Sequence, residues 1–371
     1  MAFSAKEPLL ILGGGLIGLS IAHELASAGC LVRVLNRSLR EAAGFGAAGM
    51  LAPHAEGLSS DLLVLGQLSL GLIPKWVDKI EENSGLKCEL RQCGIVVPFK
   101  TNLSRDDYLT AKSGLILNRN DLEKEIPGIS DRWKTGLLFN QDGQIDNRRC
   151  LMEALKKACQ NLGVTFEEGI EVLDIIEENK TIQAVKIVNT SGKIEYIKAE
   201  TVIISNGAWS KTIFSDLPVF PVKGQMLSIQ GPKNYIKRVL FGEGIYLVPR
   251  NDGLIIVGAT SEKDALFTKG TTTEGQFHLK QGLIDLLPIA KDWPQKELWW
   301  GFRPCTPDKK PILGSSSIKG LWVATGHYRN GVLLSAITAD LLTKCILGKQ
   351  LKEIELGLLA KFSLNRFAKK E

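Results

Sequence analysis

Three glycines near the start of the chain have the spacing of a nucleotide-binding turn. Gly13, Gly15 and Gly18 form the pattern G-x-G-x-x-G. In such a turn the first glycine permits a tight bend, the second lets the backbone approach a pyrophosphate, and the third lets a helix pack against a strand. The free N–H groups and the dipole at the start of the following helix attract phosphate oxygens. The pattern therefore predicts a dinucleotide-binding site.

The sequence also predicts the strands and the helix that must position these glycines. Residues 9–12 form an apolar run that is typical of a buried parallel strand, and a helix with a regular apolar face is expected after the turn. Gly29 is expected to end that helix, and residues 31–35 are expected to form a second strand. The first thirty-odd residues thus predict a β–α–β unit around the turn.

The residues after the second strand leave the identity of the dinucleotide open. An acidic residue usually holds the ribose hydroxyls at this point, but the chain has Asn36 followed by Arg37. Asparagine can bond a ribose hydroxyl without the strength of a charge-assisted bond. Arginine could instead contact a 2′-phosphate, so NADP stays an alternative on these residues alone.

The composition is that of an ordinary globular protein. At 371 residues the chain is long enough for two domains, and it is 44% hydrophobic and 23% charged. The net charge of +6 is spread along the sequence, which gives little support to nucleic-acid binding. The seven cysteines have no regular spacing and histidines number four, so we expect free thiols and no metal site. No apolar run has the length of a membrane span, and a cytoplasmic location is expected.

Two further segments could bring backbone N–H groups to the same ligand. Residues 41–56 are rich in alanine and glycine, and small side chains let a backbone approach a flat ligand closely. The apolar residues 201–205 run into Asn206-Gly207-Ala208, a turn expected at the carboxyl edge of the sheet, where ligands of open α/β sheets bind. An ordinary strand exit is the alternative for this second segment.

The remaining patterns predict a second domain within an α/β fold. Residues 216–304 read as short antiparallel strands joined by turns such as Asn251-Asp252-Gly253. We therefore expect a discontinuous, Rossmann-like nucleotide-binding domain with an inserted α+β substrate domain built on an antiparallel sheet. The predicted nucleotide-binding domain comprises residues 1–87, 146–215 and 305–371, and the predicted substrate domain comprises residues 88–145 and 216–304.

The last third of the chain carries a second strand–turn–helix pattern. Residues 321–347 contain an apolar strand, a turn with Gly326 and Gly331, and an amphipathic helix whose start can also face a ligand. Together with this segment, a set of motifs spans nearly the whole chain: GGGLIG, AAGMLAPHAE, NGAWS, PVKGQML, IYLVPR, VGAT, GFRPCTPD and GHYRNGVLL. In these motifs the chain resembles the D-amino-acid oxidase superfamily of flavoenzymes, and most closely the bacterial glycine oxidases of thiamine biosynthesis.

This resemblance implies FAD as the cofactor of the nucleotide-binding domain. The cysteine that holds flavin covalently in some sarcosine oxidases of the superfamily is Gly301 here, and Cys305 is displaced from it, so non-covalent FAD is expected. Residues that match the family's cofactor site are Gly13, Gly15, Leu16, Ile17, Gly18, Asn36, Arg37, Ala43, Gly44, Ala48, Gly49, Met50, Val172, His327, Tyr328, Arg329, Asn330, Gly331, Val332 and Leu333.

The resemblance also implies a substrate site. Arg303 matches the family's carboxylate anchor, and a guanidinium can bind a carboxylate through two parallel hydrogen bonds. Tyr246 matches a carboxylate-binding tyrosine, Arg329 is expected to accept from the substrate amine through its main-chain carbonyl, and Met50 is expected to line the pocket. The alternatives are a pair of Arg303 with Asp308, and plain packing roles for Tyr246 and Met50.

The implied reaction is the oxidative deamination of glycine or another small amino acid. A hydride passes from Cα to the flavin, the imine is hydrolysed, and oxygen reoxidises the flavin to give hydrogen peroxide. No side chain reads as an obligatory general base, and His54 and His327 are interpreted as structural. A D-amino-acid dehydrogenase, a sarcosine-type amine oxidase and a non-catalytic flavin-binding subunit are the alternatives. A small amino acid and oxygen are the expected partners, without nucleic acid or membrane, and a homo-oligomer stays open.

Overall fold

A six-stranded sheet carries the glycine turn. In the computed structural model, which describes residues 7–368, its strand order is β19–β20–β13–β1–β2–β9, and only β19 runs antiparallel to its neighbour. The strand–turn–helix–strand expected at the start of the chain is confirmed, with α1 between β1 and β2. The strands are β1 (Leu9–Leu12), β2 (Val32–Asn36), β9 (Thr165–Glu168), β13 (Val202–Ile204), β19 (Ile312–Ser315) and β20 (Leu321–Thr325).

The alternation of side chains along β1 shows how this sheet is covered. Leu9 and Ile11 belong to one apolar cluster, most of whose helical residues come from four helices, whereas Leu10 and Leu12 belong to another with the small sheet β10–β11–β12. Successive residues of a strand point to opposite faces, so a strand covered on both faces is apolar throughout. The helices are α1 (Leu16–Ser27), α3 (Ser60–Ser84), α6 (Met152–Asn161) and α9 (Gly331–Ile346), and the small sheet comprises β10 (Glu171–Glu178), β11 (Thr181–Val188) and β12 (Ile194–Lys198).

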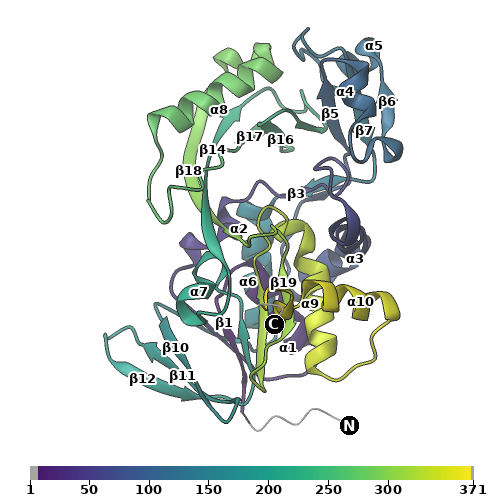
Figure 1. Cartoon of the computed structure of the whole chain (residues 1–371). Coiled ribbons are helices and arrows are strands. Elements are labelled where there is room, and N and C mark those ends of the chain that lie inside the picture. Colours follow the sequence, from purple (N-terminus) through teal and green to yellow (C-terminus); the bar gives the residue numbers. More distant parts are fainter. Residues whose placement is uncertain (1–6, 369–371) are drawn as a thin grey trace.

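An eight-stranded sheet forms the other large part of the molecule. Its order is β18–β14–β17–β16–β15–β5–β7–β6, and Figure 1 shows the long strands β14 and β18 running from this sheet toward the region of β1. The predicted antiparallel pairing holds within residues 220–305. The strands are β5 (Ile95–Phe99), β6 (Leu115–Leu117), β7 (Thr135–Phe139), β14 (Phe220–Gln230), β15 (Val239–Phe241), β16 (Tyr246–Pro249), β17 (Leu254–Gly258) and β18 (Gln295–Cys305).

The two faces of the eight-stranded sheet have different neighbours. Leu227 and Val257 pack in one cluster with Leu283 of α8 (Thr273–Leu286), which covers the outer face. Met226 and Tyr246 pack in another cluster with small residues of the segment around Ala48. The period of two along each strand therefore directs Tyr246 toward the six-stranded sheet and its glycine turn.

Short elements join the two large sheets. A three-stranded sheet pairs β8 (Gly143–Ile145) with β3 (Met50–Leu51) on one side and β4 (Leu90–Arg91) on the other. The remaining α-helices are α2 (Ala43–Gly46), α4 (Asn102–Asp106), α5 (Arg119–Glu125), α7 (Ser210–Ile213) and α10 (Glu353–Phe362). None of the helices within residues 7–368 is both long and apolar enough to cross a membrane.

Some local features were not visible in the sequence. Strand β12 was missed because most of its residues are exposed and lack an apolar alternation. One π-helical turn, Asn147–Leu151, precedes α6. The structure has a mixed α/β fold with several sheets, and the domain boundaries given above stay a prediction. Residues 1–6 and 369–371, which belong to the first and last predicted segments, lie outside the described residues.

Candidate active site

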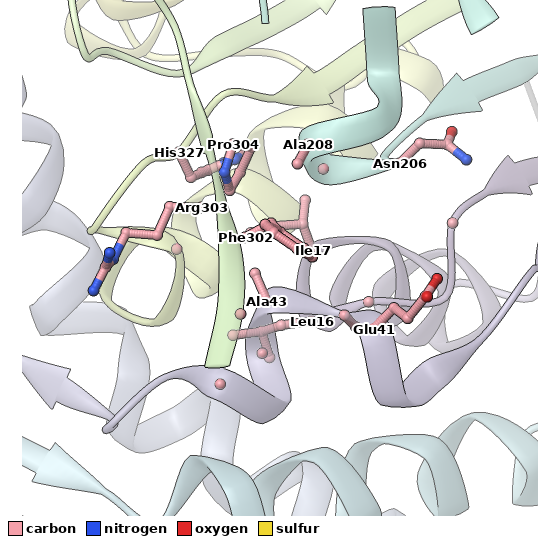
Figure 2. A pocket seen from close by; sticks show the side chains of 18 of the residues that line it. Leu16, Ile17, Glu41, Ala43, Asn206, Ala208, Phe302, Arg303, Pro304 and His327 are labelled. Atoms are coloured by element: carbon pink, nitrogen blue, oxygen red, sulfur yellow. The ribbon is translucent and has the colours of Figure 1, made fainter. Parts of the chain in front are cut away.

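A continuous cavity lies where the two large sheets meet. Its wall is built from the glycine turn, the end of β2, residues 41–50, the turn after β13, the inner side of β14 and β18, and the turn before α9. Figure 2 shows Arg303 on one side of β18 and Phe302 on the other. Both large sheets contribute to its wall, so the cavity forms only when the two sheets are packed together.

At the end of the cavity near β2, the side chain of Asn36 is held by the turn. Its Oδ1 accepts a hydrogen bond from the backbone N–H of Gly14 at 3.0 Å. Its Nδ2 is buried and has no hydrogen-bond partner among the residues that the structure describes. A buried donor of this kind costs free energy unless it is satisfied. This donor fits a ribose hydroxyl, as the sequence predicts.

The side chain of the neighbouring Arg37 already has partners within the protein. Its guanidinium lies 2.6 Å from Glu41 and stacks over the ring of Trp209 at 4.7 Å. Glu41 also pairs with Lys269 at 2.9 Å. An arginine that is paired and stacked is poorly placed to take a 2′-phosphate. The geometry therefore favours FAD over NADP at this end.

We expect that replacing Asn36 with aspartate tightens FAD binding. One carboxylate oxygen can still accept from Gly14, while the other replaces the free amide and accepts from a ribose hydroxyl. A hydrogen bond to a charged group contributes about 1 kcal/mol more than a neutral one. Titration of the apoprotein with FAD measures the change, and an affinity that is equal or weaker would show that Asn36 does not contact the ribose.

The start of α1 offers a place for phosphates. Its N-cap is Gly15, which provides no side-chain cap, and its first turn carries no acidic residue. A Cβ added to Gly15 would meet only the Cβ of Ala42 at 3.5 Å, so the turn is open on the cavity side. Free N–H groups in an uncapped first turn form an anion-binding site. The pyrophosphate of FAD fits this position.

Ala48 and Gly49, which are expected to contact the flavin, are held in place by hydrogen bonds from other parts of the chain. Arg250, which is buried, donates to the carbonyl of Ala48 at 2.6 Å, and the N–H of Ile145 donates to the carbonyl of Gly49 at 2.8 Å. Gly49 has a φ of +83°, a conformation that favours glycine. These contacts hold Ala48 and Gly49 along the wall of the cavity.

The turn before α9 forms the facing wall. The N–H of Tyr328 donates to the carbonyl of Pro304 at 2.8 Å, which ties the turn to β18. His327 is buried and its Nε2 lies 3.0 Å from the hydroxyl of Thr338. Burial lowers the pKa of His327 to about 3, so the imidazole is neutral at physiological pH. A neutral, hydrogen-bonded histidine fits the predicted structural role.

Arg303 and Tyr246 meet at the other end of the cavity. Arg303 donates from Nη1 to the carbonyl of Thr260 at 3.1 Å. Burial raises the pKa of Tyr246, while the charge of the neighbouring Arg303 opposes the rise. The alternative pair of Arg303 with Asp308 is not formed, because Asp308 lies 2.8 Å from Arg366. Arg303 and Tyr246 thus lie side by side, as expected for a carboxylate-binding pair.

A missing side chain makes room for Arg303. Its guanidinium lies flat against Gly224 of β14, where an added Cβ would be 2.5 Å from Nη2. That distance is far inside van der Waals contact, so any larger residue must displace the guanidinium. Gly224 therefore determines where the guanidinium of Arg303 can lie.

We expect that Gly224→Ala raises the KM for glycine without loss of FAD. The clash falls on the end of a flexible side chain, so Arg303 moves and the backbone stays. A misplacement of about 1 Å costs up to about a hundredfold in rate, and we expect about tenfold or more in kcat/KM. Gly71→Ala is the matched control, because an added Cβ there meets nothing within 4 Å. Equal kinetics for the two variants would contradict the role of Gly224.

Glu56 lines the same end of the cavity and was missed by the sequence analysis. Its Oε2 lies 3.5 Å from Nε of Arg329, and its side chain is 10% exposed. Burial raises the pKa of Glu56, while the charges of Arg329 and Arg303 oppose the rise. The only signal in the sequence was its position as the first acidic residue after the uncharged middle of residues 41–56.

The backbone next to Glu56 is held by a buried carboxylate. Asp142 accepts hydrogen bonds from the N–H groups of His54 at 3.1 Å and Ala55 at 2.8 Å, and it lies 2.6 Å from Nδ1 of His54. Because Asp142 lies between β7 and β8, this network joins the segment to the eight-stranded sheet. His54 lies outside the lining of the cavity, which agrees with a structural role.

Most of the predicted site residues lie together, and three do not. Gly18, Asn330 and Leu333 lie outside the cavity lining, among the residues that the structure describes. Gly18 is packed against Gly13 and Ser205, and Leu333 is buried in the helical core. The predicted residues that line the cavity are Gly13, Gly15, Leu16, Ile17, Asn36, Arg37, Ala43, Gly44, Ala48, Gly49, Met50, Val172, Tyr246, Arg303, His327, Tyr328, Arg329, Gly331 and Val332.

Comparison with known proteins gives consistent results. The family described as DAO, FAD dependent oxidoreductase, matches residues 9–345. The chain is 40% identical to the bifunctional protein ThiO/ThiG of Trichormus variabilis, over 97% of this chain and 55% of that protein. It is 30% identical to the glycine oxidase of Geobacillus kaustophilus, over 97% of each.

A solved structure shares the fold. The crystal structure of glycine oxidase from Geobacillus kaustophilus superposes with a TM-score of 0.88 at 29% identity, covering 96% of this chain and 98% of that one. The chain spans about half the length of the bifunctional relatives that it matches.

Proposed function

Because this chain belongs to the DAO family of FAD-dependent oxidoreductases, we propose that it oxidises glycine or another small amino acid. The observation that carries the proposal is the pair of Arg303 and Tyr246, at the opposite end of the cavity from Asn36. A guanidinium beside a phenol can bind a carboxylate. The glycine oxidases among its relatives support the same substrate class.

The residues of the cavity fit FAD. The start of α1 would hold the pyrophosphate, Asn36 would hold the ribose, and Ala48, Gly49 and the turn before α9 would hold the flavin. When bound, FAD supplies a two-electron acceptor that oxygen can reoxidise, which yields hydrogen peroxide. A non-covalent attachment is supported by Cys305, which is buried with its thiol bonded to the carbonyl of Thr306 at 3.4 Å.

The protein contributes binding and orientation. Arg303 and Tyr246 hold the substrate carboxylate, so that the Cα–H bond points into the cavity rather than toward water. The neutral His327 does not accept the proton at physiological pH, because its imidazole is buried and bonded to Thr338. As the resemblance to the family implies, we propose that the substrate enters with a neutral amine and that the imine product leaves to be hydrolysed in water.

The proposal extends to the pathway and the cellular location of the reaction. We propose that the reaction belongs to the thiazole branch of thiamine biosynthesis and takes place in the cytoplasm, and the resemblance to glycine oxidases of that pathway supports the first point. We further propose that the cofactor lies in the discontinuous domain and that Arg303, Tyr246 and Met50 belong to the substrate side of the cavity. The main-chain carbonyl of Arg329 is proposed to accept from the substrate amine.

A substrate panel on purified holoenzyme tests the proposal. Glycine, sarcosine, D-alanine and D-proline are supplied with oxygen, and oxygen consumption and peroxide are measured together. Peroxide formation with glycine supports the oxidase. Reduction of the flavin without oxygen consumption would indicate a dehydrogenase, a preference for sarcosine would indicate the sarcosine-type amine oxidase, and no flavin reduction by any amino acid would indicate a non-catalytic subunit.

Acid treatment of the same preparation tests the attachment of the cofactor. We expect the yellow colour to leave the precipitate and appear in the supernatant as FAD. Colour that stays with the precipitated protein would show a covalent flavin. Colourless protein that binds NADP would overturn the assignment of the cavity.

A further inference from the structure

The substrate end of the cavity holds more charge than a single carboxylate needs. Arg303 and Arg329 both line it, and either guanidinium could bind an anionic group. Glu56 lines the same end, with its Oε2 3.5 Å from Nε of Arg329. The mechanism proposed above uses the side chain of Arg303 and leaves the side chains of Arg329 and Glu56 without a role.

Glu56 is placed to act on Arg329 in particular. The other nearby carboxylate, Asp142, is occupied by the backbone of His54 and Ala55 and by the imidazole of His54. The charge of Arg303 also acts on Glu56, but the ion pair of Glu56 is with Arg329, whereas Arg303 donates to the carbonyl of Thr260 and lies against Gly224. The charge of Glu56 is therefore matched by Arg329, and Arg303 keeps its positive charge for the substrate.

We propose that Glu56 is a specificity-determining residue that restricts the site to amino acids with a single anionic group. Its ion pair occupies Arg329, so a second carboxylate on a substrate finds no free cation and meets the negative charge of Glu56 instead. Like charges in a poorly hydrated site repel strongly. Dicarboxylates such as iminodiacetate and aspartate are thereby rejected. This inference rests on the proposed function, because it concerns the substrate class of the same site.

The rival role for Glu56 is direct binding of the substrate amine. In that case the carboxylate would accept a hydrogen bond from the amine of every substrate, and its loss would weaken glycine as much as any dicarboxylate. The two roles make opposite predictions for Glu56→Gln, which keeps the size of the side chain and removes its charge. The variant separates them because it changes the preference for dicarboxylates over monocarboxylates in only one case.

The first measurement is binding without turnover. Acetate, malonate and succinate are titrated into oxidised holoenzyme, and their dissociation constants are read from the flavin absorbance. We expect Glu56→Gln to favour the dicarboxylates over acetate by about tenfold or more, the value of one charge-assisted hydrogen bond. Glu56→Gln combined with Arg329→Gln should lose this gain. Glu125→Gln is the matched control, because Glu125 pairs with Arg238 outside the cavity lining.

The second measurement is kcat/KM for glycine and iminodiacetate. We expect Glu56→Gln to retain glycine oxidation within about tenfold and to gain iminodiacetate oxidation by at least as much as the dicarboxylates gain in binding. An unchanged ratio of dicarboxylate to acetate affinity would overturn the proposal, as would a gain that persists without Arg329. A loss of glycine oxidation beyond a hundredfold without any gain would assign Glu56 to the amine.

The experiments distinguish a failure of the proposed function from a failure of the proposed role of Glu56. If the wild-type holoenzyme is not reduced by glycine or any other small amino acid, the function is wrong, whereas the anion titrations still report whether Glu56 excludes a second carboxylate. If glycine is oxidised but the titrations of Glu56→Gln and wild type agree, only the role of Glu56 is wrong.

Discussion

Arg303→Ala is expected to cause the largest loss of glycine oxidation of any single substitution in the substrate site. Without its guanidinium the substrate carboxylate has no partner in a partly desolvated cavity, and such a loss costs about 2–5 kcal/mol. Arg303→Lys should lose part of this, because an ammonium cannot form the two parallel hydrogen bonds of a guanidinium. The measurement is the rate of anaerobic flavin bleaching by glycine, across concentrations, for the wild type and both variants.

The FAD content of the Arg303 variants provides the control. Arg303 lies at the Tyr246 end of the cavity, whereas Asn36 and the glycine turn lie at the other. We therefore expect both variants to be purified with a full complement of FAD. Bleaching of Arg303→Ala at nearly the wild-type rate would refute the role of Arg303 as the anchor and would make Arg329 the next candidate.

Gly18→Ala is expected to abolish FAD binding. An added Cβ would overlap the carbonyl oxygen of Gly13 and lie 2.6 Å from Oγ of Ser205. Ser205 cannot yield easily, because its hydroxyl lies 2.9 Å from the carbonyls of both Leu12 and Gly13. The start of α1 would have to move away from the turn, and overpacking of this kind costs about 1–3 kcal/mol of stability.

Two measurements check this prediction. The ratio of flavin to protein absorbance gives the FAD content, and the urea midpoint of the apoprotein gives the change in stability. Gly71→Ala in α3 serves again as the control, since its Cβ meets nothing within 4 Å. A Gly18→Ala variant with normal FAD content and an unchanged midpoint would show that the turn has more room than the structure indicates.

Gly18 and Gly224 differ in how far the sequence alone could reveal their importance. Gly18 belongs to a local pattern, because its spacing from Gly13 and the apolar periodicity of α1 lie within one short stretch. Gly224 has no such pattern. Its importance comes from Arg303 on the neighbouring strand β18, and the register of β14 with β18 brings the two together.

The same distinction separates the candidate residues of the substrate site. Arg303 and Tyr246 were assigned through a resemblance in their motifs, and the structure places them together. Glu56 was missed because nothing in residues 41–56 shows that its carboxylate meets Arg329. Asp142 was missed for a similar reason, since its partners are the backbone and side chain of a distant turn. Contacts between distant residues leave no periodicity in a single sequence.

The sequence by itself determined the elements that depend on local interactions. The turn of Gly13 and Gly18, the buried strand Leu9–Leu12 and helix α1 follow from residue spacing, because hydrogen bonds and apolar faces within these elements involve near neighbours. Only the tertiary structure decided which side chains share the cavity. Arg303 lies against Gly224, and Glu56 faces Arg329, because strand register and the packing of two sheets fix distances that no local pattern encodes.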